Sequence, residues 1–163
     1  MSERLGRMVT LGRWTNSEGC ESGEVPADAV TDLKTMSNRL SFYCVGEDDL
    51  TINAAIAIVA NKHKNKIEKV NLAVVLREPL EAAGVNIDAT AGETALKSMI
   101  NQHRDAAKLD AYRLVEIAKA IQGAMPDAHC FTARQMKDAL KLAIKNGDLD
   151  PADLHENIRN DLA

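Results

Sequence analysis

Aromatic residues are scarce in this sequence and make up 3% of its 163 residues. A core without many rings must be built from Ala, Leu, Ile, Val and Met, which favours closely packed helices. The same scarcity argues against a platform on which nucleic-acid bases would stack. The hydrophobic content of 45% is ordinary, so a chain of this length can bury a core without a metal or a disulfide.

Cysteines and long apolar runs are also lacking. The three cysteines stand far apart at positions 20, 44 and 130, and no CxxC pair is present. An odd number of cysteines fits a reducing compartment, so we expect no disulfide and a cytoplasmic location. No apolar run approaches the roughly 20 residues that cross a bilayer, and residues 1–8 lack the apolar stretch of a signal peptide. The sequence therefore predicts no association with a membrane.

No charge of one sign dominates the chain. The chain has 20 Lys and Arg residues and 24 Asp and Glu residues, which gives a net charge of −4. DNA should therefore repel the protein weakly. One basic stripe nevertheless follows helical spacing: Arg134, Lys137, Lys141 and Lys145. A nucleic-acid-binding module that uses this stripe is one alternative. The other is a solvated face that pairs with the acidic segment after residue 150, and we expect no nucleic-acid partner.

The pattern of apolar residues predicts an α+β protein. Residues 40–45 and 70–76 each read as a buried strand, and residues 48–64 between them read as a helix that is apolar almost all round. Two buried strands joined by such a helix predict one parallel βαβ unit. With a further strand over residues 8–14 and a short edge strand at 85–87, we expect a small three- or four-stranded sheet.

The pattern changes to helices near residue 90. Thr90 with Glu93, and Thr132 with Gln135, have the spacing of capping boxes that begin helices. Four helices are predicted in all, beginning near residues 90, 111, 132 and 150. We therefore expect a small α/β sheet region over residues 1–90 and a four-helix region over 91–163, packed together as one compact unit.

A candidate site lies at the predicted edge of the parallel strands. Loops after parallel strands share one edge of a sheet, which would bring Asp48 and Asp49 close to Arg77 and Glu78. The carboxylates of Asp48, Asp49 and Glu78 could hold a hard metal ion, and Arg77 could hold a phosphate or carboxylate ligand. The alternative is that Asp48 and Asp49 only cap the following helix and that Arg77 pairs with a neighbouring acid.

Motifs for catalysis are missing from the sequence. It contains no G-x-S-x-G elbow, no G-x-G-x-x-G loop and no Walker sequence. By elimination we expect a non-enzymatic interaction or regulatory protein that binds a protein partner or forms a homo-oligomer, with no cofactor. The alternatives are a small ligand- or metal-binding enzyme at the strand edge and the nucleic-acid module. The predicted interface residues lie on amphipathic helical faces: Met99, His103, Met125 and Met136.

Overall fold

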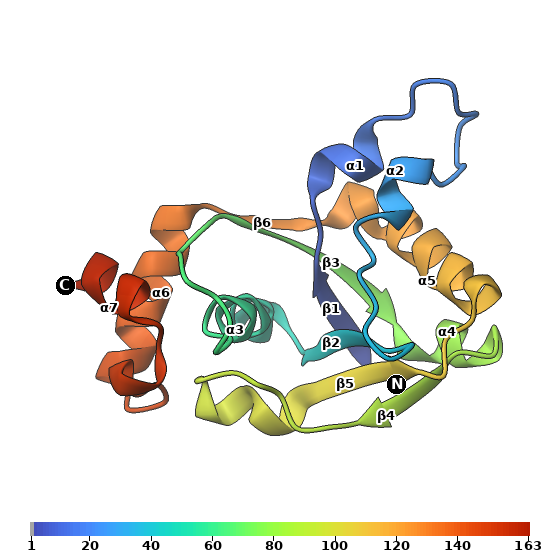
Figure 1. Ribbon diagram of the computed structural model, residues 1–163. Coiled ribbons are helices and arrows are strands. Elements are labelled where there is room, and N and C mark those ends of the chain that lie inside the picture. Colours follow the sequence, from blue (N-terminus) through green and yellow to red (C-terminus); the bar gives the residue numbers. More distant parts are fainter. Residues whose placement is uncertain (1) are drawn as a thin grey trace.

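Six strands form a single antiparallel sheet (Figure 1). The computed structural model describes residues 2–163, and for residues 48–50 it describes the backbone alone. The strands in this part of the chain are β1 (Arg4–Met8), β2 (Leu40–Val45), β3 (Val70–Leu76), β4 (Asn86–Ala89), β5 (His103–Ala107) and β6 (His129–Phe131). Their order across the sheet is β4-β5-β2-β1-β3-β6, and all neighbours are antiparallel. The first strand of the chain therefore lies near the middle of the sheet.

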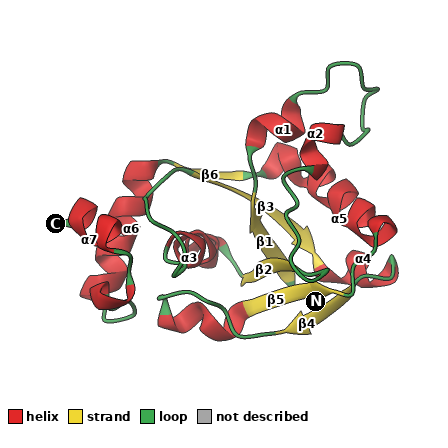
Figure 2. Ribbon diagram, viewed as in Figure 1, coloured by secondary structure: helices red, strands yellow, loops and turns green. Residues whose placement is uncertain are grey.

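Helices cover both faces of this sheet (Figure 2). On one face lie α3 (Asp48–Val59), α6 (Ala133–Lys145) and α7 (Glu156–Leu162). On the other lie α1 (Leu11–Thr15), α2 (Ala27–Val30), α4 (Arg77–Ala82) and α5 (Ala111–Ala124). The 3-10 helices η1 (Lys97–Gln102), η2 (Met125–Asp127) and η3 (Pro151–Asp153) lie in the connections. Among the residues described, no helix has both the length and the apolar content that crossing a membrane requires.

The strand over residues 40–45 is confirmed as β2, and both of its faces are covered. Its side chains alternate between the two sides of the sheet, as the pleat requires. Tyr43 and Val45 belong to the core on the α3 side, whereas Leu40 and Phe42 belong to the core on the α5 side. This one strand therefore links two separate hydrophobic cores.

The deep burial predicted for the helix that follows β2 is also confirmed. Ala54, Ala55 and Ala57 of α3 have no solvent-exposed surface, and neither does Ala60 at its end. Because these side chains are small, the helix can approach the sheet and its neighbour α6 closely. This close packing fills the core without large aromatic rings.

The predicted parallel βαβ unit and the small sheet are wrong. β2 and β3 are not neighbours, because β1 lies between them and pairs with each in the antiparallel sense. In register, Leu5 faces Cys44 of β2 on one side and Val75 of β3 on the other. The helical pattern of α3 correctly marks a long crossover, but the crossover passes over a third strand.

The part after residue 90 is not purely helical, which corrects the second half of the predicted fold. The segment read as a helix from residue 90 contains η1 and then β5, which pairs with β2 and β4. Thr90 does not cap a helix; its hydroxyl lies 2.7 Å from Nδ1 of His103. Strand pairing on both sides of β5 supplies hydrogen bonds that override the helical spacing of its apolar residues.

Of two further local predictions, the strand over residues 8–14 is wrong and the capping box at Thr132 is confirmed. Residues 8–14 are not a strand: β1 ends at Met8, and α1 begins at Leu11. In contrast, the capping box at Thr132 and Gln135 is present, with both of its hydrogen bonds, at the start of α6. The three cysteines are free, as expected.

The sheet splits between its two central strands. β1 pairs with β2 only over Arg4–Gly6, opposite Tyr43–Val45. Beyond Gly6, β1 continues along β3, whereas the first half of β2 continues along β5. The two strands therefore diverge, and a gap opens in the middle of the sheet.

We predict that Gly6→Ala destabilises the protein by roughly 1–3 kcal/mol, the usual cost of overpacking a core. A Cβ atom at Gly6 would lie 3.0 Å from Cγ1 of Val45 and 3.2 Å from Cδ2 of Leu72. The matched control is Gly123→Ala in α5, where a Cβ atom meets nothing within 4 Å. Because glycine weakens a helix, this control should gain roughly 0.5–1 kcal/mol. Urea denaturation measures both, and equal effects of the two changes would contradict the prediction.

Candidate functional site

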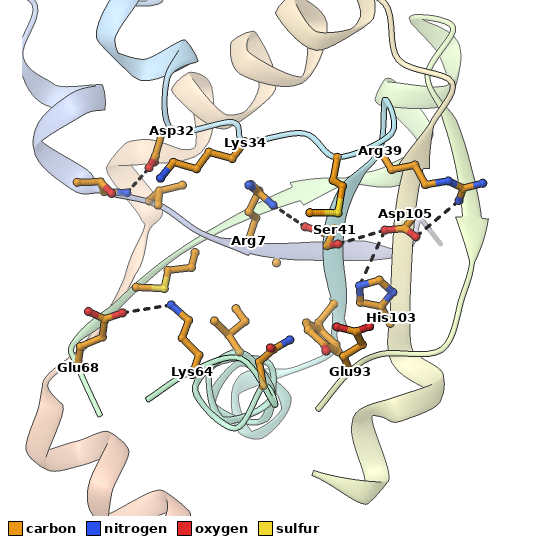
Figure 3. Close-up of a pocket in the computed structure, with 18 of the residues that line it drawn as sticks. Arg7, Asp32, Lys34, Arg39, Ser41, Lys64, Glu68, Glu93, His103 and Asp105 are labelled. Carbon is orange, nitrogen blue, oxygen red and sulfur yellow. Dashed lines mark hydrogen bonds and ion pairs between the residues drawn. The ribbon is translucent and has the colours of Figure 1, made fainter. Parts of the chain in front are cut away.

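The gap between β1 and β2 forms a cleft with a volume of about 890 Å³. Its walls are the diverging strands, the segment over residues 31–39, the segment over 91–93, and the end of α3 with the loop that follows it. Figure 3 shows charged side chains from several of these segments, and from β5, around the cleft. Strands of the sheet and the connections beside them therefore shape the site together.

Arg7 lies inside the split. It is the first residue of β1 beyond the pairing with β2, and its Nη1 donates a 2.9 Å hydrogen bond to the main-chain oxygen of Ser41 on β2. Its Nε is buried and has no hydrogen-bond partner among the residues described. Burial lowers the pKa of Arg7 to about 10, an effect that the nearby Asp32 opposes, so the side chain stays charged at neutral pH. The protein thus holds a half-buried cation in the lining of the cleft.

Most other charges around the cleft are paired. Arg13 lies 3.9 Å from Asp32, and Lys64 lies 3.2 Å from Glu68. On the opposite wall, Nη1 of Arg39 lies 3.6 Å from Asp105. In these contacts the carboxylates of Asp32, Glu68 and Asp105 each have a basic partner other than Arg7.

Asp32 holds one wall of the cleft in place. Its Oδ2 accepts a hydrogen bond of 2.7 Å from the main-chain N–H of Thr10 and one of 2.8 Å from Nε1 of Trp14. Burial alone would raise the pKa of Asp32, but the hydrogen bonds from Trp14 and Thr10 and the charge of Arg13 lower it below its usual 3.8. The carboxylate therefore fastens the segment 31–39 to the start of α1.

His103 and Asp105 form a hydrogen-bonded network on the opposite wall. Oγ1 of Thr90 lies 2.7 Å from Nδ1 of His103 and 3.2 Å from Oδ2 of Asp105. Thr90 has a single hydroxyl proton, and a carboxylate can only accept. Both contacts are satisfied when Thr90 donates to Asp105 and accepts from Nδ1–H of His103. This arrangement leaves Nε2 of the neutral imidazole as an acceptor.

Two neighbours fix the position of this network. The hydroxyl of Ser41 donates a 3.2 Å hydrogen bond to Oδ1 of Asp105, and the rings of Tyr43 and His103 meet edge to face with their centres 5.0 Å apart. Burial lowers the pKa of His103, which Asp105 opposes, and burial raises the pKa of Tyr43 to about 12. At neutral pH the wall therefore presents a neutral imidazole and an intact phenol.

The structure describes the predicted site at the strand edge only in part. The side chains of Asp48 and Asp49 lie outside the described residues, so their metal-binding role stays a prediction. Glu78 is exposed, and its main-chain N–H binds the hydroxyl of Ser2. Arg77 is bound by two acids, Glu3 at 2.7 Å and Glu81 at 2.6 Å. Among the described residues, no three acids, histidines or cysteines are grouped so that they could hold a metal ion.

The carboxylate of Glu3 gives Arg77 a structural role. Burial would raise the pKa of Glu3, but hydrogen bonds from Arg77 and Arg104 outweigh this effect and lower it. The carboxylate of Glu3 lies 3.0 Å from Nη2 of Arg104, so it joins the start of β1 to both β5 and α4. Arg77 and Arg104 thus anchor the first strand of the chain.

The predicted interface residues lie at different depths. Met99 and Met136 are buried, with 3% and 0% of their surface exposed, and both belong to the core around α3. Met125 is half-buried beside α5, and His103 is in the cleft wall on β5 rather than on a helix. The basic stripe on α6 contributes Lys137 to an ion pair of 3.3 Å with Asp161 of α7. The binding of a protein partner stays a prediction.

Sequence reasoning missed Arg7, Asp32 and Asp105. A signal for Arg7 was present, because it stands between Leu5 and Val9 at alternate positions and so shares their buried side of a strand. A charge in such a position is uncommon and needs a structural or functional reason. Placing the first strand at residue 8 hid this pattern.

Comparisons with protein families, with curated protein sequences and with solved structures found no match to this chain. The geometry of the cleft is therefore the basis for assigning a function.

We predict that His103 makes the protein less stable in mild acid. Its folded-state pKa is lowered below 6.5, so the unfolded chain takes up a proton there more readily than the folded one. The stability that this histidine contributes is present above pH 6.5 and is lost as the pH falls through the folded pKa. His103→Asn keeps a donor toward Thr90 and removes the titration, so its free energy of unfolding should fall less between pH 7 and pH 5. Urea denaturation at each pH measures this free energy. An equal change between pH 7 and pH 5 in His103→Asn and in the unmodified protein would contradict the prediction.

Proposed function

We propose that the protein binds a small polar molecule in the cleft between β1 and β2. The observation that carries this proposal is the split itself. Adjacent strands in a sheet normally continue their main-chain pairing, and a segment that forgoes it needs other hydrogen-bond partners. Among the described residues, the first half of β2 has no partner on the β1 side, apart from the bond that Ser41 accepts from Arg7. A binding site gives a physical reason to keep the sheet open.

The size and the lining of the cleft support the same proposal. Its volume of about 890 Å³ falls in the range of small-molecule sites, which span roughly 300–1,000 Å³. Such sites combine apolar walls with a few converging polar groups. Met8, Val9 and Ile58 supply apolar surface here, and Arg7 and His103 supply the polar groups.

The segment over residues 90–93 brings the wall with His103 close to the opening. Gly92 lets this segment pass the ring of Tyr43, because a Cβ atom at Gly92 would lie 2.7 Å from the phenol oxygen. Ala91, next to it, is exposed and lines the cleft. A large side chain at Ala91 should therefore occupy the cleft without entering either hydrophobic core.

We predict that Ala91→Trp blocks ligand binding without unfolding the protein. The test is a thermal-shift series with named probes of different chemistry: glucose, adenosine, adenosine monophosphate, citrate and inorganic phosphate. Any probe that stabilises the unmodified protein should lose its effect on Ala91→Trp. Ala133→Trp places the same side chain at an exposed position of α6, away from the cleft, and should behave like the unmodified protein. A shift that survives in Ala91→Trp, or no shift with any probe, would contradict the proposal.

A further inference from the structure

We infer that the molecule bound in the cleft carries an oxyanion, a carboxylate or a phosphate group, and that Arg7 is its principal partner. This inference rests on the proposed binding function and names the class of ligand. It follows from which charges around the cleft are already paired and which are not.

Two cations that line the cleft have no acidic partner among the described residues. The lining contains five Lys or Arg side chains and four Asp or Glu side chains. Each of the four acids has a basic partner within 4.0 Å, Glu93 being bound by His63 from outside at 2.8 Å. In the described part of the chain, Arg7 and Lys34 are the lining cations without an acid at that distance. The lining therefore has a formal excess of one positive charge, and the cations without an acidic partner are Arg7 and Lys34.

Arg7 differs from Lys34 because it is half-buried. Lys34 is exposed on the segment 31–39, where water solvates its ammonium group. Arg7 has a buried Nε without a partner, and its one hydrogen bond to a described residue is made by Nη1. An unsatisfied buried donor costs roughly 1–3 kcal/mol, and more when it belongs to a charged group. Folding alone gives no reason to keep such an arrangement.

An oxyanion would satisfy this arrangement. The guanidinium group presents a planar fork of N–H donors that matches carboxylate and phosphate oxygens. Figure 3 shows Arg7 rising from β1 toward the open middle of the cleft, with Lys34 reaching in from the segment above it. Arg7 would give the direct hydrogen bonds, and Lys34 would add a mobile positive charge at the entrance. His103 lies on the opposite wall, where its Nε2 is 3.9 Å from Oδ1 of Asp105.

A structural role for Arg7 makes the opposite prediction about stability. If Arg7 mainly braced the split through the main chain of Ser41, its removal would weaken the fold. If it mainly binds a ligand, Arg7→Met removes a half-buried and incompletely satisfied charge, and the unliganded protein should melt at the same temperature or higher. Ser41 is exposed, so water can replace the lost donor.

The experiment measures binding of inorganic phosphate, citrate and adenosine monophosphate by calorimetry, with adenosine as the neutral probe and potassium chloride at matched ionic strength. At least one oxyanion should bind the unmodified protein. Arg7→Met should weaken that binding roughly 10- to 100-fold, the usual worth of hydrogen bonds to a charged group. Arg7→Lys should restore part of the affinity. Arg134→Met removes an exposed arginine of α6 outside the cleft and should change nothing.

The outcomes separate this inference from the function on which it rests. Binding of citrate alone would assign a carboxylate ligand, and binding of phosphate and adenosine monophosphate alone would assign a phosphate ligand; both support the inference. Binding of adenosine or glucose that Ala91→Trp abolishes, without any oxyanion binding that depends on Arg7, would overturn the inference and leave the binding function standing. If no probe binds in the cleft at all, both fail. A lower melting temperature of Arg7→Met together with unchanged oxyanion binding would make Arg7 a structural residue.

Discussion

The position of β1 at the centre of the sheet is the constraint on which the rest of the structure depends. β1 is five residues long and pairs along its whole length with β3, but only over its first three residues with β2. Its start is fixed from several sides: Arg4 donates a 2.7 Å hydrogen bond to the main-chain oxygen of Gly46, and Glu3 is held by Arg77 and Arg104. Because that end is fixed, the divergence after Gly6 opens the sheet at the other end.

The cleft shows how the molecule balances stability against an open, charged site. Its carboxylates are tied to bases or to main-chain donors, as Asp32 is by Thr10 and Trp14, so the walls hold their shape. Arg7 and the exposed Lys34 have no acid within ion-pair distance among the described residues, and the buried Nε of Arg7 has no hydrogen-bond partner there. Residues that are poorly satisfied in the free protein are typical of binding sites, since a ligand supplies the missing partner. The location of the proposed site thus follows from an energetic imbalance rather than from a motif.

The candidate site in the sequence and the candidate site in the structure lie in different places, for an identifiable reason. The first was built on a parallel pair of strands, which would have gathered the loops after residues 45 and 76 at one edge. β1 lies between these strands, although both of them end opposite Arg4. Arg77 pairs with Glu3, which immediately precedes β1, and so has a structural partner there. The second site arises where β1 leaves β2, and no rule about parallel sheets applies there.

The sequence by itself determined the elements whose signals are local. Short apolar runs located the strands β2 and β3. Apolar periodicity and caps located the helices α3, α5 and α6, because the residues that stabilise a helix lie three or four positions apart. The tertiary structure alone decided that β1 enters between β2 and β3, that residues 103–107 form a strand, and that Arg7, Asp32 and His103 surround one cleft. A strand takes its hydrogen bonds from partners far away in the chain, so a short strand such as β1 or β5 becomes recognisable only when its neighbours are in place.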